Sequence, residues 1–495
     1  MTDGPSPFSV PPGAPSDPER QPPLPLTPSS ERVPSGPSMP PLGPPYAAPT
    51  SSPPPPRYPS APPDQWPVTP VLFPPTSQST RPSVPDTPDR SRTIIAGAVA
   101  VVFAVIVGVL VAENTGGNDA LPTAIAPTTT SSNRASDSTD SSDTTTTTAP
   151  QDLDATVLDI EAFVEKERGL TFKQHLTPTL AGEGDFQRML LADFDKQRAG
   201  LLEQQEVLTA LGLIEPGTDV IDAEKTLLDI GVVGFYDPET KQLVVRGKKV
   251  TPYVREVLAH ELTHALDDQY FNLNRPELEN AEGDETFGFL GLVEGNARRV
   301  EDAYLASMSP DDQAAAAQEQ AQLLAQHPEV FSLPRVLIEL LQEPYQDGPL
   351  FVGQLLAHGG QAQLDATFNA LPTSSEQILH PERYLAGDVP VQVPVPNADG
   401  TASNTGTLGE LMMREMLFDS SASSSEIDRG LTGWGGDSYV TWTDSSGQTC
   451  LRDQAVGDTS TDTAELGQIL QQWAQEHGGT VEAPGGGPVT LTVCK

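Results

Sequence analysis

The stretch His260-Glu261-Leu262-Thr263-His264 constrains this chain more than any other part of its sequence. Thr251 is suited to cap a helix, Pro252 suits the first helical turn, and no helix breaker follows until about Asn272. Histidines four positions apart lie one above the other on the same face of such a helix. Apolar residues on most sides predict that the helix is buried, namely Val257, Leu258, Leu262, Ala265 and Leu266.

Two imidazoles in a buried helix need polar partners, and a zinc ion held at about 2.0–2.1 Å from each is the simplest one. Glu261 would lie beside them, where its carboxylate can reach a water molecule on the metal. A catalytic zinc ion takes a third protein ligand and keeps one position open. Glu294 is the candidate, because it follows an apolar run, precedes the small residue Gly295, and no histidine occurs between His264 and His327. The alternatives are a solvated helix with two idle histidines and a glutamate at the surface.

Several stretches together resemble a known family. Leu258-Ala-His-Glu-Leu-Thr-His-Ala-Leu-Asp-Asp-Gln-Tyr, followed by Leu292-Val-Glu-Gly-Asn-Ala, is similar to the gluzincin type of zinc metallopeptidase. More narrowly, the chain resembles a group of bacterial neutral zinc metallopeptidases that are mostly uncharacterised. The similarity spans about residues 155–445 and includes Val164-Glu-Lys-Glu-Arg-Gly-Leu-Thr-Phe, Gly234-Phe-Tyr-Asp-Pro-Glu-Thr-Lys-Gln-Leu, Pro372-Thr-Ser-Ser-Glu-Gln-Ile-Leu-His-Pro-Glu-Arg-Tyr and Gly433-Trp-Gly-Gly-Asp-Ser-Tyr.

The resemblance implies that His260, His264 and Glu294 bind Zn²⁺ and that Glu261 is the catalytic base. One position departs from the family pattern. The best-known gluzincins have an aspartate four residues after the glutamate ligand, and this aspartate orients a zinc-bound histidine. Arg298 occupies that place here, so the orienting carboxylate must come from elsewhere. The candidates are Glu301, Asp302 and Asp284.

Composition separates the chain into an unfolded and a folded part. Of the 51 prolines, 31 lie before residue 92, so residues 1–92 are expected to be a disordered Pro-rich tail, either passive or a contact for a cytoplasmic partner. Acidic residues outnumber Lys plus Arg by 68 to 28, and the formal net charge is −40. This charge argues against a nucleic-acid partner and against docking on anionic lipid.

Residues 93–112 form an apolar run without a charged residue, long enough to cross about 30 Å of hydrocarbon. Arg90 and Arg92 precede this predicted transmembrane helix, so the tail is expected in the cytoplasm and the rest of the chain outside a cell membrane crossed once. Residues 113–152 are a Ser/Thr-rich linker. Small residues every fourth position raise the hypothesis that the span self-associates: Ala96, Ala100, Ala104, Gly108 and Ala112.

Residues 153–495 are expected to fold as the metallopeptidase domain. Its fold class is predicted to be α+β, mainly helical and zincin-like. A β-hairpin is expected just before the zinc helix, with strands at 232–236 and 241–246 around the turn 237–240. By resemblance, this hairpin supplies the edge strand that pairs with a peptide substrate. Helices are expected at 158–166, 184–212, 311–326, 333–342, 351–357 and 361–371.

The last part of the chain, about 430–495, is predicted to be mixed α/β. Strands are expected at 438–443, 448–452 and 489–493, and a helix at 463–477 with a capping box formed by Asp462 and Glu465. Cys450 and Cys494 are the two cysteines of the chain. Since both would lie outside the membrane, a disulfide between them is expected, with zinc ligation as the lesser alternative.

The expected activity is hydrolysis of peptide bonds in a peptide or protein substrate, with Glu261 taking the proton of the attacking water. The developing oxyanion needs a donor opposite the metal, and His380 and Tyr384 are the candidates. A structural histidine is an equally good interpretation of His380. The main alternative function is a cell-envelope binding or scaffold protein with structural zinc or none. A weaker one is a hydrolase of non-peptide amides such as cell-wall crosslinks.

Overall fold

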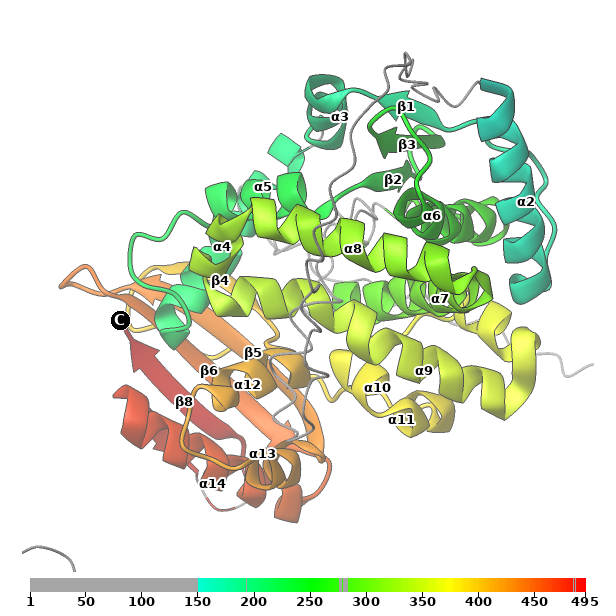
Figure 1. The fold of residues 1–495 in the computed structure, drawn as a ribbon. Helices are drawn as coiled ribbons and strands as arrows, with labels where there is room; N and C mark the ends of the chain where they lie inside the picture. Colours follow the sequence, from blue (N-terminus) through cyan, green and yellow to red (C-terminus); the bar gives the residue numbers. More distant parts are fainter. Residues whose placement is uncertain (1–149, 193, 276–277, 279–283, 484, 486) are drawn as a thin grey trace, which may run out of the picture. The chain divides into compact units, whose positions relative to one another are not determined.

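A small sheet and one long helix organise the first half of the described chain (Figure 1). The computed structural model describes residues 150–495 except 193, 276–277, 279–283, 484 and 486. The sheet has the order β1-β3-β2, with β1 (Thr179–Ala181) parallel to β3 (Gln242–Arg246) and β2 (Gly234–Asp237) antiparallel to it. The predicted hairpin is therefore confirmed, and β2 is the outer strand. The Asp237 carboxylate shapes its turn by accepting hydrogen bonds from the backbone N–H groups of Glu239 and Thr240.

Helices cover both faces of this sheet. On one face, apolar side chains of β2 and β3 pack against α2 (Pro150–Arg168) and α6 (Pro252–Phe271). Phe235 and Val244 point to the other face, which packs against the first residues of α9 and three further helices. These are α3 (Glu183–Leu190), α4 (Phe194–Leu211) and α5 (Val220–Gly231). The alternation of side chains along β2 and β3 thus places α6 against one face only.

The middle of the chain is helical, as expected. It contains α7 (Glu285–Ser307), α8 (Pro310–Gln326), the 3₁₀ helix η2 (Pro328–Ser332), α9 (Arg335–Thr367), α10 (Ser375–Leu379) and α11 (Pro381–Ala386). The predicted break between residues 342 and 351 was wrong, because Pro344 and Pro349 lie inside α9. The predicted break between residues 357 and 361 is confirmed, because the backbone leaves helical geometry at Gly359 and Gly360.

The C-terminal part is mixed α/β, as predicted. Its antiparallel sheet has the order β4-β5-β6-β8-β7, and its helices α12, α13 and α14 pack with this sheet and with the end of α4 around one core (Figure 1). The predicted disulfide is confirmed, because Cys450 on β6 and Cys494 on β8 are bonded register partners. The predicted capping box was displaced by three residues, since Thr459 is the N-cap of α14 and Asp462 is its partner. The elements are β4 (Ala402–Gly406), α12 (Gly409–Phe418), α13 (Ser424–Leu431), β5 (Trp434–Thr443), β6 (Thr449–Gly457), α14 (Ser460–His477), β7 (Thr480–Glu482) and β8 (Val489–Cys494).

The description "mixed α+β and mainly helical" holds for this part of the chain. No helix among the described residues is long and apolar enough to cross a membrane. The Pro-rich tail at 1–92, the expected transmembrane helix at 93–112 and the linker up to residue 149 lie outside the described residues.

Helices α7 and α9 cross at glycines. A Cβ atom built on Gly295 would overlap the backbone of Gly348, and one built on Gly348 would overlap the carbonyl oxygen of Gly291. The two backbones therefore touch, and no residue with a side chain fits at the crossing without moving a helix. The small residue that the sequence analysis noted after Glu294 thus brings α7 against α9.

We predict that Gly295→Ala destabilises the protein by about 1–3 kcal/mol, because the added methyl group forces the helices apart. The matched control is Gly353→Ala, also on α9, where a Cβ atom meets nothing within 4 Å. This control should be neutral or raise the stability by up to about 1 kcal/mol through helix propensity. Urea unfolding followed by circular dichroism measures both changes. Equal stabilities for the two variants would contradict the close crossing.

Candidate metal centre

Helix α6 begins and ends where its sequence predicts. The Thr251 hydroxyl accepts a hydrogen bond from the Val254 N–H at 3.2 Å, Pro252 occupies the first turn, and Asn272 ends the helix with a φ of 55°. Nearly every residue from Tyr253 to Asp268 is buried. The prediction of a buried helix is therefore confirmed, and the two histidines of this helix lie in the protein interior.

His260, His264 and Glu294 come together through their nitrogen and oxygen atoms. The two Nε2 atoms are 2.9 Å apart, and Glu294 Oε2 lies 3.1 Å from Nε2 of His260 and 3.4 Å from Nε2 of His264. The three residues are 0%, 1% and 2% exposed, respectively. Ligand atoms in a tetrahedral zinc site with bonds of 2.0–2.1 Å are about 3.3 Å apart, so this donor set fits a divalent metal ion.

A second carboxylate orients His260. Glu301 Oε2 lies 2.9 Å from Nδ1 of His260, and Arg298 donates to the other Glu301 oxygen at 3.0 Å. With its proton on Nδ1, His260 donates to Glu301 and directs the lone pair of Nε2 toward Glu294 and His264. Of the three carboxylates considered, Glu301 makes this contact, whereas Asp302 pairs with Arg298 and Asp284 accepts from Ser375. Burial opposes the charged form of His260, but without a metal ion its contacts with Glu294 and Glu301 outweigh burial and raise its pKa to about 10, so a metal ion would have to displace the Nε2 proton.

The spacing of residues along α7 explains how Arg298 can occupy the position where the best-known gluzincins have an orienting aspartate. Glu294, Arg298 and Glu301 follow one another at helical spacings of four and three, so all three lie on the side of α7 that faces α6. The carboxylate is one turn further along, and Arg298 holds it in place.

Glu261 is poised beside the cluster and is not part of it. Its Oε2 accepts a hydrogen bond from the Tyr236 N–H of strand β2 at 2.8 Å. Its Oε1 is buried without a protein partner. Burial raises the pKa of Glu261 to about 8, with His260 opposing the shift and Glu294 adding to it. In its ionised form, Glu261 has one fixed and one free oxygen, which suits it to accept a proton.

Tyr345 of α9 is a site residue that the sequence analysis missed. Its ring stacks on His260 at a centroid distance of 5.9 Å, and its hydroxyl is buried without a partner that meets hydrogen-bond geometry. Burial, followed by the nearby Glu294 and Glu261 carboxylates, raises its pKa well above the ordinary value, so the hydroxyl keeps its proton. Pro344 and Pro349 concealed the helix that carries Tyr345. Gly348 one turn later was the available signal.

A buried ion-pair network supports the other end of the cluster. Asp267, one turn after His264, accepts hydrogen bonds from Arg168 of α2 and from Asn296 of α7, both at 2.6 Å. The stacked rings of Phe271 and Phe368 lie near the Arg168 guanidinium, with centroids at 5.6 and 5.5 Å. These contacts hold α2, α6 and α7 together next to the histidines, and sequence reasoning had assigned none of them.

The structure places His380 and Tyr384 away from these contacts. His380 Nε2 lies 2.9 Å from Glu410, which raises the pKa of His380 mainly through that hydrogen bond. The Tyr384 hydroxyl donates to the Ala370 carbonyl oxygen at 2.7 Å. Within the described part of the chain, no hydrogen bond, ion pair or ring contact joins either residue to His260, Glu261, His264 or Glu294.

Comparisons with known proteins concern the other end of the chain. A family described as a domain of unknown function, DUF8575, matches residues 395–492. This segment contains the C-terminal sheet with α12, α13 and α14, and the metal cluster lies outside it. No curated protein and no solved structure matches the chain.

We predict that Glu301→Gln weakens binding of a divalent metal ion by about 10- to 100-fold, because His260 loses the carboxylate that orients it. Asp302→Asn is the matched control, since Asp302 also pairs with Arg298 and its side chain is half exposed. The control should bind metal like the wild type. Competition with a chromophoric chelator gives the affinities, and equal affinities for both variants would remove Glu301 from the site.

Proposed function

We propose that the described part of this chain is a zinc-dependent peptidase of the gluzincin type, with a zincin-like fold. The observation that carries the proposal is the convergence of His260, His264 and Glu294 next to a glutamate that is not one of the ligands. A structural site needs only the ligands, whereas hydrolysis also needs a base within reach of the metal. Glu261, with one oxygen unpaired, meets that requirement.

Each residue of the site has its own role in the proposed hydrolysis. His260, His264 and Glu294 would hold the zinc ion, which supplies Lewis acidity and makes a water molecule acidic near neutral pH. Glu261 accepts the proton of the attacking water at Oε1 and returns it to the leaving amine. The Tyr236 N–H fixes the other oxygen of Glu261, so the proton-accepting oxygen keeps its direction. Glu301 holds His260 in the required tautomer.

Tyr345 is better suited than His380 or Tyr384 to stabilise the oxyanion. The Tyr345 hydroxyl is protonated and close to Glu294 and Glu261, so it can donate to the carbonyl oxygen of a scissile bond. The hydroxyl of Tyr384 and the ring of His380 are engaged with Ala370 and Glu410. In this proposal the two sequence-predicted residues support the fold around α10 and α11.

Strand β2 would align the substrate. It is one of the two edge strands of its sheet, and its Tyr236 N–H reaches Glu261, so a peptide paired with β2 passes over the proposed base. The four residues of the site and most of β2 are buried in this structure. Cleavage therefore requires the elements around β2 to separate before a peptide enters.

The complete burial of the cluster also favours one alternative, a binding or scaffold protein in which zinc is structural. Closed sites shielded from water are typical of structural zinc. In that case the metal would stabilise the fold, and Glu261 would be a neutral buried acid.

Localisation is part of the proposal. We infer a single-pass membrane protein with its N-terminus in the cytoplasm and residues 113–495 outside. The Cys450–Cys494 disulfide supports an oxidising compartment for the folded part. The lipid bilayer, a peptide or protein substrate, a second copy joined through the membrane span and a cytoplasmic partner of the tail are the proposed partners.

The deciding experiment compares wild type with Glu261→Gln, using full-length protein purified in mild detergent. Wild type should contain about one zinc ion per chain and cleave a mixture of unstructured peptides. Glu261→Gln should retain the zinc and lose the cleavage by at least about 10³-fold, because the general base is gone. Mass spectrometry detects the products, and elemental analysis measures zinc.

Glu215→Gln on the surface is the matched control and should cleave like the wild type. Removal of zinc with a chelator should abolish cleavage, and added zinc should restore it. Zinc without cleavage in the wild type would support the scaffold alternative. Full activity in Glu261→Gln would refute the proposed mechanism.

We further predict that Tyr345→Phe lowers kcat by about 10²- to 10³-fold and leaves KM and zinc content nearly unchanged, because the hydroxyl acts on the developing oxyanion. Tyr384→Phe is the matched control and should keep a kcat within a few-fold of wild type. A loss confined to Tyr384→Phe would reverse the assignment of these two tyrosines.

A further inference from the structure

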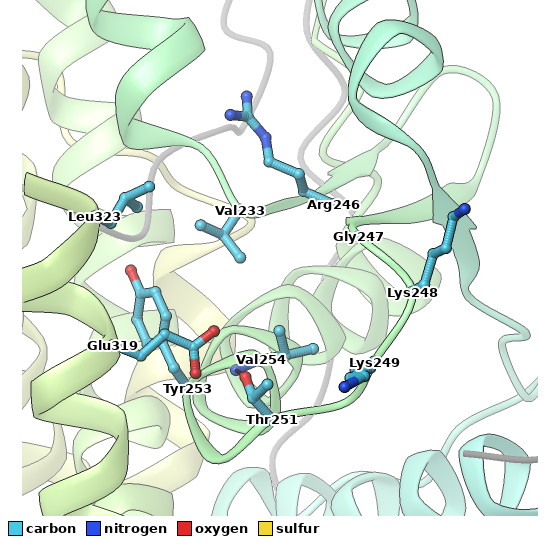
Figure 2. Close-up of a pocket in the computed structure, with 10 residues that line it drawn as sticks. All are labelled: Val233, Arg246, Gly247, Lys248, Lys249, Thr251, Tyr253, Val254, Glu319 and Leu323. Carbon is cyan, nitrogen blue, oxygen red and sulfur yellow. Dashed lines mark hydrogen bonds between the residues drawn. The ribbon is translucent and has the colours of Figure 1, made fainter. Parts of the chain in front are cut away.

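A cavity of about 400 Å³ lies at the N-terminal end of α6 (Figure 2). Its walls come from three places: the start of β2, the first turn of α6 and the C-terminal half of α8. The loop between β3 and α6 forms its basic rim. Its lining includes Val233, Lys248, Lys249, Tyr253, Val254, Glu319 and Leu323.

The inner wall of the cavity combines an apolar surface with one buried hydroxyl and the carboxylate of Glu319. Val233, Val254, Leu323 and the Tyr253 ring surround the space in Figure 2. Tyr253 is 1% exposed, and its hydroxyl has no hydrogen-bond partner. A buried hydroxyl without a partner costs free energy, so a residue of this kind at a cavity wall is suited to a ligand that offers an acceptor.

The cavity is close to the proposed base along β2. Val233 directly precedes this strand. The next residue, Gly234, packs against α6, and a Cβ atom built on it would lie 3.8 Å from Cγ of Glu261. The Tyr236 N–H donates a hydrogen bond to Glu261. Successive strand residues are about 3.3 Å apart, so Val233 lies about 10 Å along the strand from Tyr236. A peptide extended along β2 would thus place a side chain two or three residues from its scissile bond in the cavity.

The rim carries positive charge that the protein itself does not neutralise. Lys248 and Lys249 are exposed, and neither forms an ion pair with another described residue. Arg246 differs, because Glu183 and Asp229 lie 3.3 and 3.4 Å from its guanidinium. The chain as a whole has a formal net charge of −40, so these two adjacent lysines form a small positive region on an otherwise acidic protein. Such a region attracts a negatively charged group.

We propose that this cavity is a specificity subsite for peptides in which a medium-sized apolar side chain stands next to an acidic residue. The apolar side chain fills the space between Val233, Val254 and Leu323. The acidic residue lies at Lys248 and Lys249, and the Tyr253 hydroxyl donates to an acceptor on the bound peptide. This inference rests on the proposed function for its link to cleavage, but binding can be measured without it.

The test measures binding to full-length, zinc-loaded Glu261→Gln by fluorescence anisotropy. The probes are fluorescein-labelled Gly/Ser decapeptides with a central Leu-Asp pair in either order. Matched peptides carry Leu-Lys or Ala-Asp at the same positions. At low ionic strength we expect one Leu-Asp order to bind at least about fivefold more tightly than either matched peptide, and 0.5 M NaCl should reduce the preference for Asp.

Variants in the same background locate the binding. Lys248→Glu combined with Lys249→Glu should weaken Leu-Asp binding by about three- to tenfold and leave binding of the Leu-Lys peptide unaffected or improved. Lys166→Glu, at an exposed lysine on α2, is the charge control and should have no effect. Tyr253→Phe should weaken binding by about three- to tenfold while the thermal midpoint stays equal or rises, since an unpaired buried hydroxyl is removed.

Each outcome has a defined meaning. Equal binding of the Leu-Asp, Leu-Lys and Ala-Asp peptides, or no measurable binding, would overturn the subsite. So would a lysine variant that behaves like Lys166→Glu, or a Tyr253→Phe variant that loses stability but not affinity. Selective binding to Glu261→Gln, without cleavage of the same peptides by wild type, would support the subsite and count against the peptidase. Cleavage of the peptides by wild type, without tighter binding of a Leu-Asp peptide, would support the peptidase and overturn the subsite.

Discussion

The structure depends on how the charge of three buried carboxylates is balanced. Glu261, Glu294 and Glu301 all lie close to His260 in the interior, and Arg298 forms an ion pair with Glu301. Carboxylates in such surroundings are costly unless a positive group or a proton accompanies each of them. The Glu294 oxygen faces two imidazole nitrogens, which is the arrangement that a divalent cation would complete. The same geometry leaves Glu261 with a raised pKa and an unpaired oxygen.

Backbone contact determines where these charges stand. The glycine crossing of α7 and α9 is directly next to Glu294 and three residues from Tyr345, so one contact positions a ligand from one helix and an aromatic hydroxyl from the other. Strand β2 contributes through the Tyr236 N–H rather than through a side chain. The site is thus assembled from four elements, and the first turn of α6, some two turns from His260, borders the cavity that would select the substrate.

The parts of this arrangement that local sequence determines could be predicted. Thr251, Pro252 and Asn272 delimit α6, the Asp237 turn produces the hairpin, and the spacing of His260 and His264 places both on one helix face. Glu294 was predicted as the third member of the cluster because no histidine lies between His264 and His327 and because the family resemblance implies it. What failed depended on distant packing. Two prolines predicted breaks in a helix that tolerates them, so Tyr345 was overlooked. His380 and Tyr384 were chosen by residue type, and their partners Glu410 and Ala370 could not be identified from neighbouring sequence.

The buried Arg168 has a mechanical consequence. Helix α2 begins at Pro150, where the Ser/Thr-rich stretch ends. In its last turn, Arg168 donates a hydrogen bond to Asp267, which lies one turn after His264. The first helix after that stretch is therefore linked by side chains to the helix with both imidazoles. Tension applied to the stretch would be transmitted through α2 into α6, instead of being dissipated in a loosely attached terminal segment.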